Sequence, residues 1–343
     1  MVTLKDIALQ AGVNASTVSR ALGDSREISD EMKRKIRDIA RKLDYTPNAY
    51  ARALVGKSSA TIGLILPEVR SNYYARIANA IEHEFQKQGY SIVIGLTEFE
   101  YKHEVKSLEI LGMRQVDGIL LTGAMYAQTR KTLDRIRDGY RIPIVLLDAI
   151  SRIKGYDHVV IDNRSSIATA VARCEESGIR TFGFIGDQIA HRGRLPRFRH
   201  ALADRSLNLS KEATIITQER FEHGGYLGMK ALLALPHPPQ AVFAAYDNMA
   251  IGALRAVYES GLSVPRDIAV FGYDDIREGE YLFQPLTTIH APVEEMARIG
   301  VNLITDRIGG SVHENQPVRS IHVKATAVFR DTTPKGRCGE YPS

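Results

Sequence analysis

Cysteine is scarce in this chain of 343 residues, because only Cys174 and Cys338 are present, too few for a disulfide framework. A long apolar run is missing from the amino terminus, so we expect neither a signal peptide nor a membrane anchor. The hydrophobic content of 44% and the charged content of 25% are typical of a soluble globular protein with a substantial core. We therefore expect a cytoplasmic protein that does not contact a membrane.

The motifs of common catalytic and cofactor sites are also missing. The chain has no Gly-x-Ser-x-Gly, no His-Glu-x-x-His, and no Gly-x-Gly-x-x-Gly after a predicted strand. Its ten histidines show no metal-ligand spacing. Gly56-Lys57-Ser58 resembles the end of a phosphate-binding loop, but Ala51 stands where that loop needs its first glycine. We therefore expect no enzymatic activity, no cofactor and no metal site.

The first 22 residues carry the patterns of two short helices. Apolar residues recur at helical spacing in the first, at Leu4, Ile7, Ala8 and Ala11. Gly12 can adopt positive φ and so allows a sharp turn, after which Asn14 or Ser16 can cap the second helix. The second helix would bury Val18, Ala21 and Leu22 and expose Ala15, Ser16, Ser19 and Arg20. This pattern is typical of a helix-turn-helix that binds DNA, although an ordinary helical hairpin shares it.

A third helix and the charge distribution support the DNA-binding interpretation. From about Asp30 to Leu43 the inward positions are Met32, Ile36, Ile39 and Leu43, and the basic side chains face outward. Residues 1–57 hold 11 Lys and Arg against 7 Asp and Glu, whereas the other 286 residues hold 34 against 33. A charge run is usually only a solvated helix face, but this one lies beside the helix-turn-helix, where phosphate contacts would use it.

A linker follows the third helix. Pro47 ends that helix, because the residue before a proline is disfavoured in helical conformation. Asn48 can cap about two further helical turns before Gly56. So short a helix is marginal in water, and we expect it to need a partner or DNA.

From Thr61 onward, short apolar runs alternate with helical stretches. The first series of predicted strands is TIGLIL, SIVIGL, GILLT, PIVLLD and HVVID, and the second is TFGFIG, ATIIT, QAVFAA and IAVFGY. Alternating β and α units predict parallel sheets covered on both faces, and two series predict two lobes. The expected fold class is an all-α helix-turn-helix headpiece followed by an α/β bilobed core with two doubly wound parallel sheets.

Polar and aromatic side chains follow several predicted strands. They are Asn72, Tyr73, Tyr74, Asp148, Arg194, Tyr246, Asp247, Asp274 and Asp275. Ligands bind at the carboxyl ends of strands in such sheets, so we expect a ligand cleft there. An Asp at a strand end often caps the next helix instead, and this is the preferred interpretation of Asp275 and an alternative for Asp247.

Three strings occur in the order TVSRAL, YTPNAYARAL and TIGLILP. In this order and spacing they resemble the lactose-repressor (LacI/GalR) family of bacterial transcription regulators. The resemblance extends from Thr3 to about Arg330. It implies a core like that of periplasmic binding proteins and a dimer that binds a pseudo-palindromic operator in double-stranded DNA.

The resemblance also implies roles in DNA binding. Ala15, Ser16 and Arg20 would face base edges in the major groove, with Arg20 suited to a guanine. Phosphate contacts would come from Thr3, Asn14, Thr17, Ser19, Ser29 and Asn48. Ala51 and Leu54 would lie on a hinge helix over the minor groove, where Leu54 would be wedged between base pairs. The alternative is that Leu54 is only the last hydrophobic contact of a tether.

For the core, the resemblance implies an effector cleft lined by Asp148, Arg194, Phe221 and Asp274. Asn72, Tyr73, Tyr74 and Tyr246 complete the expected site, although Tyr246 departs from the Asn or Ser that is usual in the family. Carboxylates and an Arg suit the hydroxyl groups of a sugar, and an aromatic ring suits its apolar face. We expect a repressor of a carbohydrate-utilisation operon. The alternatives are a regulator that responds to a purine or another metabolite, and a transport protein that binds sugar without a DNA role.

One segment of the core is unusually basic, with His191, Arg192, Arg194, Arg197, Arg199 and His200. It could meet an anionic effector such as a sugar phosphate or sugar acid. A solvated helix face is the preferred interpretation, because such runs usually face water.

The predicted division of the chain follows from these patterns. Residues 1–46 form the helix-turn-helix domain, 47–59 the hinge helix and linker, and 60–331 the bilobed core. The first lobe covers about 60–160 and 290–317, and the second about 161–289 and 318–331. The polar tail 332–343 has no heptad of leucines, which the family's tetramers use, so we expect a homodimer.

Overall fold

The computed structural model describes residues 2–25, 27–45, 58–123, 126–149, 153–309 and 317–335. The chain divides into two compact units, residues 1–59 and 60–343. Most of the predicted hinge segment, including Asn48, Ala51 and Leu54, lies outside the described residues.

The first unit is a bundle of three helices, α1 (Leu4–Ala11), α2 (Ala15–Leu22) and α3 (Asp30–Lys42). Gly12 ends α1 with a φ of 71°, as its position predicts. The side chains of the small core come from all three helices and include Ile7, Val18, Ala21 and Ile36. Asn14 occupies the cap position of α2, but its side chain makes no capping hydrogen bond.

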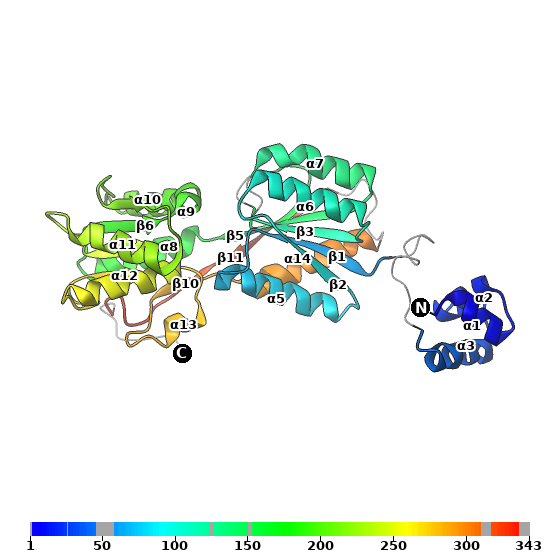
Figure 1. Ribbon diagram of the computed structural model, residues 1–343. Helices are drawn as coiled ribbons and strands as arrows, with labels where there is room; N and C mark the ends of the chain where they lie inside the picture. The colour runs from blue at the N-terminus through cyan, green and yellow to red at the C-terminus, as the bar shows by residue number, and fades with distance from the viewer. Residues whose placement is uncertain are drawn as a thin grey trace. The chain divides into compact units, whose positions relative to one another are not determined.

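The second unit begins with a six-stranded parallel sheet in the order β11-β5-β4-β3-β1-β2. Its strands are β1 (Thr61–Leu66), β2 (Ser91–Leu96), β3 (Gly118–Thr122), β4 (Ile144–Leu147), β5 (Asp157–Asp162) and β11 (Ser320–Lys324). Helices α5 (Asn72–Gln86) and α14 (Val293–Ile308) cover one face, and α6 (Tyr101–Met113) and α7 (Arg130–Asp134) cover the other (Figure 1). We call this part the first lobe.

The alternation of side chains along its strands explains the two layers. Leu120 of β3 packs in the cluster that contains Ile77 of α5, whereas its neighbours Ile119 and Leu121 pack with Leu108 of α6. Successive residues of a strand point to opposite faces, so a continuous apolar run is needed where both faces are covered. This is why these strands read as unbroken apolar runs in the sequence.

The second lobe has a four-stranded parallel sheet in the order β7-β6-β8-β9. Its strands are β6 (Phe182–Gly186), β7 (Thr214–Ile216), β8 (Ala241–Ala244) and β9 (Ala269–Phe271). Its larger helices are α8 (Arg164–Glu176), α10 (Arg194–Ala203), α11 (Phe221–Leu233) and α12 (Asp247–Glu259), and α9 (Gln188–Arg192) and α13 (Arg277–Glu280) are short. Phe198, Phe243 and Phe271 form an aromatic cluster in its core, in which the last two rings stack 4.9 Å apart. All nine predicted strands are present, which confirms the fold class.

Three strands were not expected from the sequence. β10 (Thr288–His290) and β12 (Thr326–Val328) form a small antiparallel pair beside the second sheet. β11 pairs with β5 and so extends the sheet of the first lobe, whereas residues 318–331 were assigned to the second lobe. That assignment is wrong for β11, which belongs to the first lobe, and the chain returns to the second lobe only after Lys324. The strand SIHVK has too few apolar residues to be recognised as a buried strand.

Helices α11 and α12 approach so closely that only glycine fits at their crossing. A Cβ atom on Gly252 would overlap the carbonyl oxygen of Glu222, and one on Gly225 would overlap that of Met249. Because both obstacles are backbone atoms, we expect Gly252→Ala to lower the free energy of unfolding by about 3 kcal/mol or more. Gly139→Ala is the matched control, since its Cβ would meet only Arg135 Cγ at 4.0 Å. Equal urea midpoints for the two variants would contradict this close packing.

Candidate functional site

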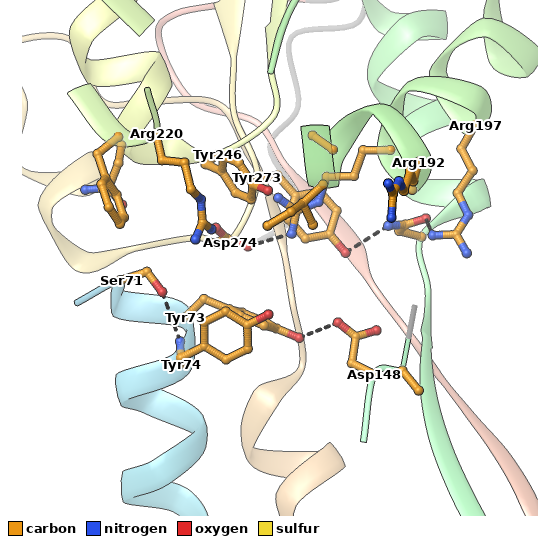
Figure 2. A pocket seen from close by; sticks show the side chains of 18 of the residues that line it. Ser71, Tyr73, Tyr74, Asp148, Arg192, Arg197, Arg220, Tyr246, Tyr273 and Asp274 are labelled. Atoms are coloured by element: carbon orange, nitrogen blue, oxygen red, sulfur yellow. Dashed lines mark hydrogen bonds and ion pairs between the residues drawn. The ribbon is translucent and has the colours of Figure 1, made fainter. Parts of the chain in front are cut away.

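A cavity of about 320 Å³ lies at the carboxyl ends of the strands of both lobes. Seven of the eight residues predicted to bind an effector line it: Tyr73, Tyr74, Asp148, Arg194, Phe221, Tyr246 and Asp274. Figure 2 shows the tyrosines of α5 and Asp148 from the first lobe facing Arg220, Tyr246 and Asp274 from the second. We call this cavity the pocket.

The local fold places these side chains directly after a strand or at the start of a helix that follows one. Tyr73 and Tyr74 lie in the first turn of α5, which follows β1, and Asp148 directly follows β4. Three of the pocket residues have left-handed backbone conformations, with φ values of 45° at Asp148, 69° at Phe221 and 114° at Asp274. Such conformations are unfavourable for residues other than glycine and cluster at functional sites. The backbone therefore supports a functional role for the pocket.

Asp148 is oriented by a tyrosine. The hydroxyl of Tyr73 donates to Asp148 Oδ2 at 2.6 Å. Burial and then the charge of Asp148 raise the pKa of Tyr73 well above its ordinary value, so the hydroxyl keeps its proton. Within the described ranges, Oδ1 of Asp148 has no hydrogen-bond partner and is therefore available to accept from a ligand.

Arg194 is the most enclosed cation of the pocket. Its guanidinium carbon lies 3.7 Å from the ring centre of Tyr273 and 4.6 Å from that of Tyr246. Its Nη2 is 3.0 Å from Asp274 Oδ1, and the side chains of this ion pair are only 14% and 5% exposed. Its Nη1 donates to the carbonyl of Ala245. A buried ion pair of this kind is costly to break, because the partner left behind keeps an unpaired charge.

Arg220 is a pocket residue that the sequence interpretation missed. Its Nε lies 2.9 Å from Asp187 Oδ2, and its guanidinium carbon lies 4.6 Å from the ring centre of Phe99. Tyr246 donates its hydroxyl to the same carboxylate, at 3.0 Å from Oδ1. This hydrogen bond gives Tyr246 a structural role at a position where the family usually has Asn or Ser.

Other lining residues were also missed, namely Ser71, Asn163, Tyr273 and Asn248. Asn163 directly follows β5, Tyr273 precedes Asp274, and Arg220 precedes Phe221. Their position next to a strand end or to a predicted residue is the only signal in the sequence that could have found them.

Asn72 does not line the pocket, so this part of the prediction is wrong. Its side-chain amide donates to Glu278 Oε2 at 2.8 Å, outside the pocket. Asn72 lines a different hollow, together with Arg76 and Glu278, because its side chain points toward α13, which follows β9.

The two aspartates expected to cap helices have other partners. Asp247 accepts the hydroxyl of Thr288 at 2.6 Å and the backbone N–H of Ile276 at 2.9 Å. Asp275 pairs with Arg330 at 2.8 Å and lies 2.9 Å from His290 Nδ1. Both carboxylates therefore join the loop after β9 to other segments of the second lobe.

Burial changes the ionisation of two carboxyls near the pocket. It raises the pKa of Asp247 to about 7, and the charge of Asp274 adds to this effect. Burial also raises the pKa of Asp274 to about 6, although the neighbouring Arg194 opposes it.

The raised pKa of Asp247 predicts a pH dependence of stability. Between its ordinary value of 3.8 and about 7, the folded protein holds a proton that the unfolded chain has lost, so the free energy of unfolding falls as pH rises. Asp247→Asn removes this titration and keeps both hydrogen bonds, because an amide can donate to Thr288 Oγ1 and accept from Ile276. From pH 5 to 7.5, we expect the wild type to lose on the order of 2 kcal/mol relative to this variant in urea unfolding. Parallel pH profiles would contradict the prediction.

In the first unit, α2 presents the predicted base-reading surface. Ser16 and Arg20 are exposed, and Ala15, Thr17 and Ser19 are partly exposed. Arg20 Nη1 lies 3.0 Å from Glu27 Oε2, and both side chains are mostly in solvent, so this contact is weak.

Two predicted phosphate contacts are helix-capping residues in the structure. The hydroxyl of Thr3 donates to Asp6 Oδ2 at 2.7 Å, and Ser29 Oγ accepts from the backbone N–H of Met32 at 3.3 Å. Asn14, at the start of α2, is exposed.

The part of the chain that the structure describes contains no helix long and apolar enough to cross a membrane. The same residues contain no group of three or more His, Cys, Asp or Glu arranged to hold a metal ion.

Both units match known families. Residues 3–48 match the bacterial regulatory proteins of the lacI family, and residues 171–333 match the periplasmic binding protein-like domain. The ribose operon repressor of Haemophilus influenzae is 32% identical over 335 residues, which cover 97% of this chain and 98% of that protein. The HTH-type transcriptional repressor PurR of Erwinia tasmaniensis is 32% identical over 346 residues, which cover 99% of each.

Solved structures share the fold over nearly the whole chain. The lac repressor dimer bound to operator and the anti-inducer ONPF matches with a TM-score of 0.86 and 24% identity, covering 97% of this chain and 99% of that one. The complex of the transcriptional regulator CelR with cellobiose matches with a TM-score of 0.69 and 27% identity, covering 97% and 100%. The chain therefore belongs to the lacI family of DNA-binding bacterial transcriptional repressors.

Proposed function

We propose that this protein represses a carbohydrate-utilisation operon and that a sugar or sugar derivative bound in the pocket controls its affinity for the operator. The pocket carries the proposal. It combines the carboxylates Asp148 and Asp274 with Arg194, which suit the hydroxyl groups of a sugar, and the ring of Phe221, which suits its apolar face. The names of two relatives, the ribose operon repressor and the CelR–cellobiose complex, support a sugar.

A purine effector is the second candidate. The protein is as similar to PurR of Erwinia tasmaniensis as to the ribose operon repressor, at 32% identity to each. The aromatic side chains of the pocket, among them Tyr73, Tyr74 and Phe221, could also stack on a planar base.

An effector in the pocket would contact both lobes and so favour one lobe arrangement over another. The lobes already touch through hydrogen bonds from Arg76 Nη1 to the carbonyl of Asp274 at 2.9 Å and from Asn72 to Glu278 at 2.8 Å. An effector that binds one arrangement more tightly shifts the population toward it. We propose that this shift orders or melts the hinge helices predicted from the sequence, to which Ala51 and Leu54 were assigned.

We further propose that the protein acts in the cytoplasm as a homodimer on a pseudo-palindromic operator, since two copies of α2 then meet two inverted half-sites. Ala15, Ser16 and Arg20 would contact bases. The proposed phosphate contacts are Thr3, Asn14, Thr17, Ser19, Ser29 and Asn48.

Arg20→Ala tests the proposed base readout. If Arg20 donates to a guanine, its loss should reduce discrimination between operator and scrambled duplex by about 5- to 150-fold, which corresponds to about 1–3 kcal/mol. Fluorescence anisotropy with both duplexes measures the ratio. Arg41→Ala is the control, because this exposed cation of α3 makes only a weak ion pair at 3.7 Å with Asp38. An equal loss of affinity for both duplexes in Arg20→Ala would contradict the assignment.

A further inference from the structure

Four arginines line the pocket, and the charges of two of them are already paired. Arg194 pairs with Asp274 at 3.0 Å, and Arg220 pairs with Asp187 at 2.9 Å. Within the described residues, the lining also holds one carboxylate without a cation partner, Asp148, so the two remaining arginines leave the pocket with an excess of positive charge.

Arg192 and Arg197 have no carboxylate within 4 Å among the residues that the structure describes. Arg192 is exposed and forms no hydrogen bond or ion pair with any of these residues. Arg197 Nη1 donates to Asn163 Oδ1 at 2.8 Å. The amide of Asn163 is buried and donates in turn to the hydroxyl of Tyr273 at 3.1 Å. Arg197 is therefore held in place by a neutral group and forms no ion pair with the described residues, and the carboxylate whose charge acts on it, Asp162, is already paired with Arg164.

The basic residues of this segment do not form one solvated face. Arg192, Arg194 and Arg197 line the pocket, whereas the remaining basic residues of the segment are exposed and do not: His191, Arg199 and His200. Arg194 and Arg197 are three residues apart on α10, so they share a face of that helix. In Figure 2, Arg192 and Arg197 lie on the same side of the pocket, and Arg220 lies on the other.

A neighbouring hollow increases the positive charge on this side. It shares Ala149, Val160 and Arg197 with the pocket, and it is also lined by Lys154 and Arg164. Its carboxylate, Asp162, is already paired with Arg164 at 2.9 Å. Several cations in a recess concentrate a positive potential and attract anions.

We infer that the effector carries a carboxylate or phosphate group that Arg192 and Arg197 bind, while its hydroxyl groups contact Asp148. This inference rests on the proposed function, since it assigns the effector to the same pocket. A guanidinium binds both a carboxylate and a phosphate through paired N–H donors. The two arginines therefore indicate that this group of the effector is negatively charged, and the experiment below distinguishes carboxylate from phosphate.

Matched pairs of neutral and anionic compounds test the inference with the full chain. The compounds are glucose, gluconate and glucose 6-phosphate, ribose and ribose 5-phosphate, with adenine as a neutral base. Thermal melting and calorimetric titration report binding. We expect at least one anionic compound to raise the melting temperature and to bind at least tenfold more tightly than its neutral counterpart. The gluconate and sugar-phosphate arms distinguish carboxylate from phosphate.

Substitutions of Arg192 and Arg197 test whether these two residues cause the preference for an anionic compound. R192Q/R197Q should weaken binding of the anionic compound at least tenfold, and R197K should weaken it less, because it keeps the charge. R199Q is the control, an exposed arginine of the same helix outside the pocket, and should bind as the wild type does. All four side-chain changes lie outside the apolar core, and urea unfolding checks that each variant is folded.

Three results would overturn the inference: a neutral compound that binds as tightly as its anion, unchanged anion binding in R192Q/R197Q, or no shift with any anionic compound. Failure of the proposed function would look different. In that case an anionic compound would bind through the two arginines without changing the affinity for operator DNA.

Discussion

A chain that lacks residues 1–59 is expected to lose sequence-selective binding to its operator, with an affinity for that duplex at least about 10³-fold lower. These residues contain α1, α2 and α3 and nearly all of the excess positive charge. Without them, the remaining chain lacks the proposed recognition helix α2, and its 34 Lys and Arg are nearly balanced by 33 Asp and Glu, which leaves little net positive charge to attract phosphates. Fluorescence anisotropy with an operator selected by the full chain measures the loss.

The same truncated chain should still bind its effector. All the residues that line the pocket lie in the second compact unit, which has its own core. The control is therefore an unchanged thermal shift on addition of whichever compound stabilises the full chain. Sequence-selective affinity in the truncated chain would show that the DNA-binding surface has been assigned to the wrong unit.

Asp274→Ala is expected to abolish the response to effector and to destabilise the protein by about 3–5 kcal/mol. The carboxylate is nearly buried and pairs with Arg194, whose guanidinium lies between the rings of Tyr246 and Tyr273. The substitution leaves that cation without its partner and removes an acceptor from the pocket. Operator binding without effector should persist, because the residue is not in the DNA-binding unit.

Two further variants separate the causes. Asp274→Asn keeps an acceptor of the same shape and should cost less stability than the alanine variant. Asp274→Ala combined with Arg194→Met removes the unpaired charge and should recover part of the lost free energy of unfolding. Asp138→Ala, an exposed carboxylate outside the pocket, should change neither property. A full effector-induced change in operator affinity in Asp274→Ala would contradict the assigned role.

The strands and the helix-turn-helix could be predicted because their signals are local. A short unbroken apolar run such as TIGLIL, followed by a helical stretch, predicts a buried strand, and β1 forms there. β11 could not be predicted, because only Val323 of SIHVK is buried and its pairing with β5 is formed by a distant segment. Pairing between segments far apart in sequence has no local signature.

The pocket was predicted more completely than its electrostatics. Strand ends identified Asp148 and Asp274, but the partners of Arg194, Arg220 and Arg197 depend on which loops meet in space. The preferred interpretation of the basic segment, a solvated face, holds for Arg199 and fails for Arg194 and Arg197, which are partly buried in the pocket; Arg192 is exposed and lies at the pocket as well. The prediction that Asn72 lines the pocket was wrong for a related reason, since the position of a residue in the sequence does not define where its side chain points.

Selection from a random duplex library with the full chain tests the central claim most directly. If two protomers present two copies of α2 to one duplex, the enriched sequences should contain two inverted copies of one short motif. Loss of this enrichment on removal of residues 1–59 should follow. Enrichment of sequences without inverted symmetry, or no enrichment at all, would contradict the account.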